Sequence, residues 1–204
     1  MTPRRTERGL DRLVNFSDAT VAIAITLLIL PLVEVASEYD GDLGRLVGDN
    51  VGTFLAFAIT FLVIGRFWVL HHGLFEQVRG YTGRLLEANL VWLASIVFLP
   101  FAANVLSHAD GGPAAHGPVY ALYIGTMIVT SGSTLWMRAL LSRDPALVAD
   151  DGDVQVLPAA VAVITLAVAL VLALLVPQVG MLWLLLLVLA GPATRILRRR
   201  SRHS

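Results

Sequence analysis

The sequence contains no cysteine and no lysine, so all fifteen of its basic residues are arginines. The absence of cysteine excludes disulfide bonds and thiolate metal sites. Charge is also scarce: charged residues make up 15% of the chain, whereas an average soluble domain has about a quarter. Hydrophobic residues make up 56% of the chain, and the mean hydropathy is +0.74. This composition indicates a membrane protein.

Several functional motifs are also missing. The sequence has no glycine-rich phosphate loop, no Gly-x-Ser-x-Gly motif and no His-Glu-x-x-His motif. It therefore gives no evidence for the enzyme classes that these motifs mark. It also lacks Thr-Val-Gly-Tyr-Gly, which excludes the usual carbonyl-lined filter of potassium channels. We expect no enzymatic activity, no cofactor, no bound metal and no nucleic-acid partner.

The apolar runs predict an all-α, polytopic membrane protein with six transmembrane helices in a single domain, residues 1–204. Each run is close to the roughly 20 residues that cross a bilayer as a helix. The expected spans are approximately 14–35, 50–71, 87–107, 118–137, 154–176 and 181–196.

The arginine distribution predicts the orientation of these spans. If the N-terminus is inside, thirteen arginines fall in inside segments, only Arg45 lies in an outside loop, and Arg66 lies within the second span. Positive residues favour the cytoplasmic side, so both termini are expected in the cytoplasm. The arginine-rich C-terminal tail either contacts anionic lipid headgroups or simply stops transfer across the membrane.

One face of the first predicted span carries a regular stripe of side chains. Its members recur at intervals of four and three residues, which is the spacing of one helix face. A stripe of this kind is typical either of a packing seam between helices or of one wall of a hydrophobically gated ion pathway. The stripe consists of Phe16, Thr20, Ile23, Leu27, Leu30 and Glu34.

Polar residues gather at one depth near the cytoplasmic ends of the first three spans. Cross-helix hydrogen bonds would tie these ends together. Ser17 and Asp18 have a second interpretation as caps of free backbone N–H groups early in their helix. His71 is expected either to pair with the carboxylate of Asp18 or to lie in an interfacial aromatic belt. The set is Arg12, Ser17, Asp18, His71 and Asn89.

These residues carry a family resemblance. The string Arg12-x-x-x-Phe16-Ser17-Asp18, which opens the first of six spans, resembles the motif of the transmembrane-protein-175 family of cation channels. Further matches are Trp68-x-x-His71, Phe75, Asn89 and Pro100-Phe101.

The resemblance implies a potassium-permeable channel without a filter loop, conducting potassium and other monovalent cations. Prokaryotic members of the family have one six-span unit per chain, assemble as homotetramers and lie among the lipids of the plasma membrane. By position, Ile23, Leu27 and Leu30 would line the pore and form its gate, and Thr26 would affect cation selectivity. The polar network with a structural or gating role would be Arg12, Phe16, Ser17, Asp18, His71 and Asn89.

An alternative is a proton-coupled cation transporter in which Asp18 and His71 form a relay. Acidic and imidazole groups inside a membrane do serve as proton relays in carriers. The sequence shows no inverted repeat and no pair of broken helices, which are features of many transporter folds.

Overall fold

The computed structural model describes residues 7–108, 116–150 and 152–175. These residues are almost entirely helical, which confirms the predicted all-α class. The sixth predicted span, 181–196, lies outside the described residues. The helices are α1 (Glu7–Leu27), α2 (Leu30–Ala36), α3 (Leu43–Asp49), α4 (Val51–Phe75), α5 (Gly83–Ser107), α6 (Gly117–Arg143) and α7 (Leu157–Leu175), with a short 3-10 helix, η2 (Pro145–Leu147).

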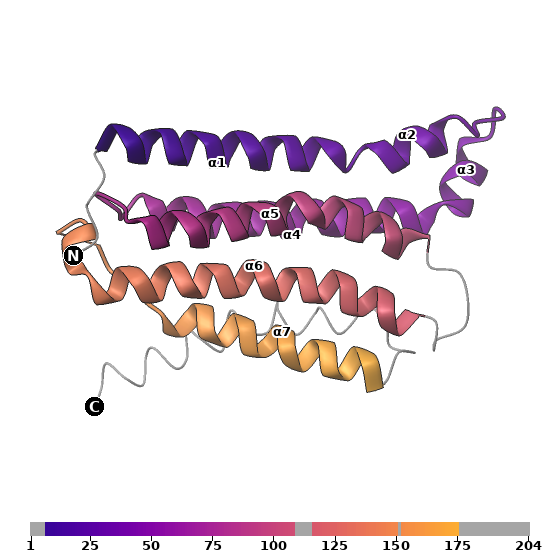
Figure 1. The fold of residues 1–204 in the computed structure, drawn as a ribbon. Helices are drawn as coiled ribbons and strands as arrows, with labels where there is room; N and C mark the ends of the chain where they lie inside the picture. The colour runs from indigo at the N-terminus through magenta and orange to yellow at the C-terminus, as the bar shows by residue number, and fades with distance from the viewer. Residues whose placement is uncertain (1–6, 109–115, 151, 176–204) are drawn as a thin grey trace.

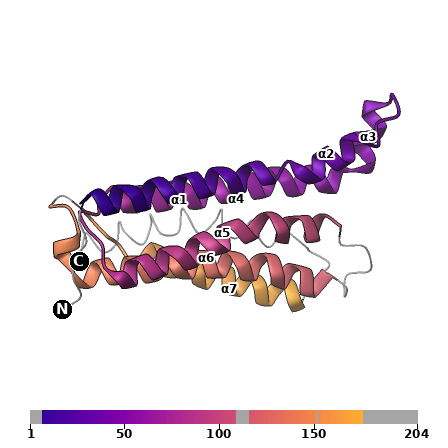
Figure 2. The same ribbon diagram turned by 45° about the horizontal axis from the view of Figure 1, so that its top comes forward.

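The long helices run side by side, as Figures 1 and 2 show. Helix α1 packs on α4 and α5, while α6 lies between α5 and α7. One end of the bundle, here called the arginine-rich end, holds the start of α1, the end of α4, the start of α5 and the end of α6 (Figure 1). The opposite end, here called the acidic end, carries α3 and the loop that precedes it.

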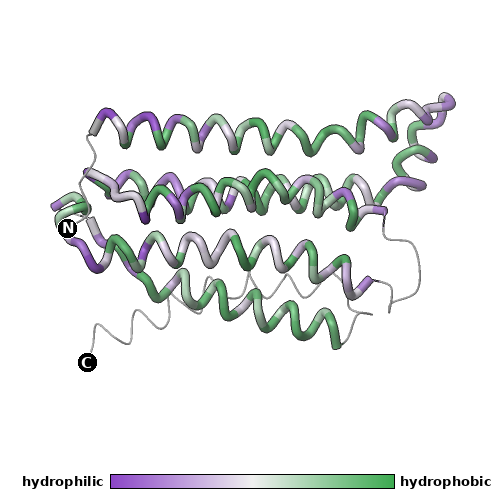
Figure 3. Tube along the Cα trace, in the orientation of Figure 1, coloured by the Kyte–Doolittle hydropathy of each residue, from purple (hydrophilic) through white to green (hydrophobic). Residues whose placement is uncertain are grey.

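Four helical segments are long and apolar enough to cross a membrane: Arg8–Ala36, Val51–Phe75, Gly83–Ser107 and Leu157–Leu175. Figure 3 shows α7 as hydrophobic along nearly its whole length and α6 as mixed. The hydroxyls of α6 compensate for this polarity within the helix, because Thr126, Thr130 and Thr134 each bond the carbonyl four residues earlier. Helix α6 therefore packs among its neighbours with few unsatisfied groups.

The first predicted span is not one continuous helix, because the chain turns at Leu28 and Ile29 between α1 and α2. Pro31 explains the interruption. Proline has no backbone N–H, so the carbonyl of Leu27 loses its partner four residues ahead. The amides of Leu28 and Ile29 bond back three residues instead, to Ile25 and Thr26 at 3.3 and 3.2 Å, which tightens the turn.

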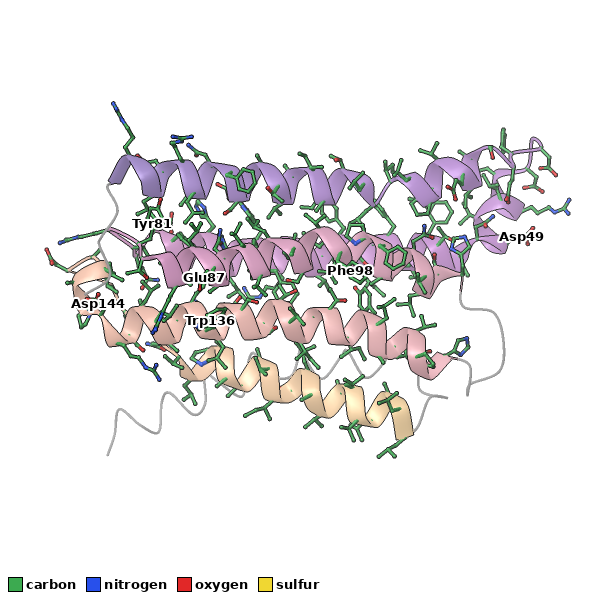
Figure 4. The ribbon with its side chains drawn as sticks, viewed as in Figure 1. Asp49, Tyr81, Glu87, Phe98, Trp136 and Asp144 are labelled. Atoms are coloured by element: carbon green, nitrogen blue, oxygen red, sulfur yellow. The ribbon has the colours of Figure 1, made fainter. Side chains whose placement is uncertain are left out.

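At the arginine-rich end, the loop after α4 pairs with the loop after α6. Val78 and Val148 form an antiparallel bridge, flanked by a 2.8 Å bond from the Arg79 amide to the Leu147 carbonyl. The Arg79 guanidinium also donates two bonds to the Asp150 carboxylate, at 2.9 and 2.7 Å. Figure 4 places Tyr81 and Asp144 at this end and Asp49 at the acidic end.

Candidate functional site

Helix α1 has one face against the protein and another turned away from it. The buried face steps by three or four residues, as expected of an amphipathic helix. Its members pack against α4 and α5. They are Leu10, Leu13, Ser17, Val21, Ala24 and Leu28.

Ser17, His71 and Asn89, here called the polar cluster, join three helices by side-chain hydrogen bonds. Nε2 of His71 in α4 lies 2.6 Å from Oδ1 of Asn89 in α5. Nδ2 of Asn89 donates to Oγ of Ser17 in α1 at 2.9 Å. All three side chains are buried. The structure thus brings together three residues predicted to share one membrane depth.

The order of donors in the polar cluster follows from the chemistry of each atom. An amide oxygen only accepts, so His71 donates from Nε2 to Asn89. Ser17 accepts from Asn89 and donates its own proton to the Leu13 carbonyl at 2.9 Å. Each buried polar atom in the chain of bonds therefore has a partner, which is what a buried network requires.

Aromatic rings hold the imidazole of His71 in place. The ring of Trp92 stacks on it with centroids 4.0 Å apart. The ring of Phe75, on the next turn of α4, has its centroid 4.5 Å from that of the imidazole. Trp92 is fully buried, and our sequence reasoning missed it. The signal was present, because Trp92 follows Asn89 by three residues and therefore shares its helix face.

Asp18 bonds to a different residue from the one expected. The indole Nε1–H of Trp68 in α4 donates to Oδ1 of Asp18 at 2.9 Å. Within the described residues, no hydrogen bond joins Asp18 to His71, the pair on which the transporter alternative depends. Trp68 also stacks on His72, with centroids 5.3 Å apart, which positions the indole toward α1.

Two residues of the predicted network lie outside the polar cluster. Arg12 is exposed, and among the described residues no hydrogen bond or ion pair links it to Ser17, His71 or Asn89. Phe16 is 58% exposed and belongs to the stripe. Both residues point away from the buried face of α1.

The predicted pore residues lie on the side of α1 and α2 that no other described helix covers. Ile23, Leu27 and Leu30 are 61%, 40% and 53% exposed. Thr26 is also exposed, and its Oγ1 donates to the Ile23 carbonyl at 2.7 Å. A row of large apolar side chains on the outside of a protomer is a surface for lipid, for another copy or for a pore.

The described residues offer no group of three or more His, Asp or Glu side chains that could hold a metal ion. The site consists instead of a polar cluster that joins α1 to α4 and α5, beside an exposed apolar stripe. Together with the four candidate membrane spans, this indicates a polytopic helical membrane protein.

The comparisons with known proteins narrow this class. Residues 12–100 match the family model described as endosomal/lysosomal potassium channel TMEM175. The matched region, 89 of the 204 residues, belongs to this family and includes the polar cluster and the stripe.

Curated relatives come from bacteria and animals. A potassium channel of Streptomyces collinus is 31% identical over 61% of this chain and 62% of its own length. A potassium channel of Chryseobacterium sp. is 33% identical over 51% of this chain and 53% of its own. The endosomal/lysosomal proton channel TMEM175 of Bos taurus is 34% identical over 67% of this chain and 31% of its own. The chain thus matches less than two thirds of each relative.

Proposed function

We propose that the chain is one subunit of a homotetrameric, potassium-permeable cation channel in a prokaryotic plasma membrane. Family membership supports this proposal, as do two bacterial relatives that are named potassium channels. The observation that carries it is the exposed stripe on α1, whose opposite face is held by the polar cluster.

In the proposed channel, four copies of α1 and α2 surround the pore. Rings of Ile23, Leu27 and Leu30 form a constriction in place of a filter loop. Narrow apolar rings exclude water and block ions, and a small widening or rotation lets a cation pass. Thr26, between the first two rings, is proposed to affect the preference among cations.

The proposed topology completes the subunit. Residues 1–204 form one domain of six spans, with both termini in the cytoplasm and the arginine-rich end on the cytoplasmic side. The acidic end then faces outward, where its carboxylates raise the local cation concentration. These carboxylates are Glu34, Glu38, Asp40 and Asp42. The proposed partners are monovalent cations and membrane lipids, with no cofactor.

Planar-bilayer recording of the purified protein under a potassium/sodium bi-ionic gradient tests the proposal. We expect a passive current that carries cations and excludes chloride, with a reversal potential that is independent of a pH gradient. A flux that requires a pH gradient would instead favour a coupled carrier. No conductance in correctly assembled protein would reject the channel function.

A further inference from the structure

Arg66 is a charged side chain in an unusual place. It lies in α4, a candidate membrane span, and its side chain is exposed. Among the described residues, no hydrogen bond or ion pair satisfies its guanidinium. A charge at this depth is costly and is usually paired, so Arg66 needs a partner that the described residues of one copy do not supply.

Asp18 is the matching negative charge. Its one hydrogen-bond partner in the described residues is the uncharged indole of Trp68, and no cationic side chain among these residues forms an ion pair with its carboxylate. That bond also gives the depth of Asp18, which is level with Trp68. Arg66 is two residues from Trp68, or about 3 Å along the helix axis. The two unbalanced charges therefore lie within about one helix turn of each other in depth.

Another carboxylate, Glu87, lies too far along the bundle to be the partner of Arg66. The bond between His71 and Asn89 aligns α4 with α5. Glu87 lies two residues from Asn89 toward the arginine-rich end (Figure 4), whereas Arg66 lies five residues from His71 in the other direction. The offset is about 10 Å, which favours Asp18 on depth alone.

Arg66 projects from the side of α4 opposite to the side that faces Asp18 of its own protomer, so the two side chains of one copy do not meet. Trp68 faces α1, and residues two apart project about 200° from each other around a helix. Arg66 therefore leaves α4 on the flank turned away from its own α1.

Asp18 also lies on an accessible flank of α1. Asp11, Asn15, Asp18 and Ala22 recur at intervals of four, three and four, which places them on one helix face. The other three are exposed, and Asp18 is half-buried. This flank is distinct from both the buried face and the stripe that contains Ile23.

We infer that Arg66 of one copy pairs with Asp18 of the next copy around a closed ring. This inference rests on the homo-oligomer of the proposed function and adds the interface that forms it. In a ring built from heterologous contacts, each copy presents two different patches. One patch is the Arg66 flank of α4, the other is the Asp18 flank of α1, and each interface receives one pair.

A double-mutant cycle tests the pairing through the stability of the oligomer in detergent, measured by native mass spectrometry. Asp18→Asn is suitable because its amide retains an oxygen that accepts from Trp68. We expect Arg66→Gln and Asp18→Asn each to raise the dissociation constant at least about tenfold, as for close charge pairs at interfaces, and the double variant to be no worse than either. The control cycle of Arg66→Gln with Glu87→Gln should be additive.

Cysteine cross-linking tests the contact without touching either charge, since the chain has no cysteine of its own. Ala22 and Leu62 are both exposed and lie one turn from Asp18 and Arg66 toward the acidic end. Tagged Ala22→Cys copies are co-expressed with untagged Leu62→Cys copies and oxidised with copper phenanthroline. We expect a disulfide-linked dimer containing one tagged and one untagged copy.

The outcomes separate the two levels of the proposal. Additive Arg66→Gln and Asp18→Asn effects without the mixed dimer, in a protein that is still oligomeric, would overturn the pairing and leave Arg66 facing lipid. A monomeric wild-type protein in native mass spectra would overturn both the homo-oligomer and the pairing. Coupled effects together with the mixed dimer would support the pairing even if bilayer recordings showed no potassium current.

Discussion

The two halves of the first predicted span differ in how they are held. Residues 7–21 are tied to α4 and α5 by two hydrogen bonds: Asp18 accepts one from Trp68, and Ser17 accepts one from Asn89. Within the described residues, no side-chain hydrogen bond joins residues 22–36 to another helix. The helix is also interrupted there, at the turn before Pro31. A pore-lining helix that is fixed at one end and held only by apolar packing at the other can change radius where the stripe lies. In the proposed channel, the first half would position the subunit and the second half would gate it.

The largest expected effect comes from removing the centre of the polar cluster. Asn89→Ala leaves the buried His71 N–H without its acceptor and removes the hydrogen bond that Ser17 Oγ accepts, although Ser17 still donates to the Leu13 carbonyl. Each unsatisfied group is costly, so we expect a loss of about 2–4 kcal/mol of stability, measured by thermal unfolding in detergent. Ser133→Ala is the control, because Ser133 bonds only to the Val129 carbonyl of its own helix among the described residues. Equal losses in both variants would contradict a special role for the polar cluster.

The next effect concerns the second half of the span. Ile23→Asn places a polar group in the proposed constriction and favours its hydration. We expect conductance to rise on the order of tenfold, equivalent to about 1.4 kcal/mol of barrier, with weaker discrimination among cations. Bilayer recording measures both quantities. Ile164→Asn on α7 is the matched control, because Ile164 is 63% exposed and Ile23 is 61% exposed. Unchanged conductance in Ile23→Asn would argue against a pore position.

A smaller effect is expected from closing the interruption. Pro31→Ala restores an N–H that reaches the Leu27 carbonyl, so α1 and α2 can join into one helix. We expect a gain of about 1 kcal/mol in local stability, seen as slower hydrogen exchange of the amides of Leu28 and Ile29. Unchanged exchange at these two amides would show that packing, rather than Pro31, causes the turn. Exchange at the polar cluster should not change, which would separate the two halves further.

The smallest effect lies outside the spans. The Arg79 guanidinium bonds Asp150 and lowers the pKa of its carboxyl below the ordinary value. A lowered pKa in the folded state stabilises the fold above the unfolded pKa of about 4, and this contribution is lost as the pH falls through the folded pKa. Asp150→Asn should therefore unfold slightly earlier than wild type at neutral pH, and the difference should vanish in strong acid. A difference that persists in acid would mean that the carboxylate charge is not responsible.

Much of the fold followed from local patterns. The lengths of the apolar runs predicted α4, α5 and α7, because helices that cross a bilayer fall within a narrow range of lengths. Periodicity placed Ile23, Leu27 and Leu30 on one face, and the structure leaves all three exposed. Whether that face meets an ion pathway remains a prediction, because a stripe of this kind suits lipid or another subunit equally well.

Pairwise contacts between helices were harder to predict. The depth of His71 and Asn89 was readable from their positions in their spans, but the pairing of Asp18 with Trp68 instead of His71 depends on helix rotation. A one-residue change of register turns a side chain by about 100°, which sequence patterns do not resolve. The break before Pro31 could have been predicted from the sequence, since proline excludes the hydrogen bond that would continue the helix. We predicted one continuous span because the residues around Pro31 are hydrophobic.

The most direct measurement is modification of a cysteine introduced at Ile23 during bilayer recording, which is feasible because the chain has no native cysteine. A charged methanethiosulfonate reagent applied to Ile23→Cys should alter the potassium current within the recording. The same reagent should leave the current of Ile164→Cys unchanged despite its similar exposure in one protomer. Equal currents before and after treatment of Ile23→Cys, with labelling confirmed by mass spectrometry, would contradict a pore lined by α1.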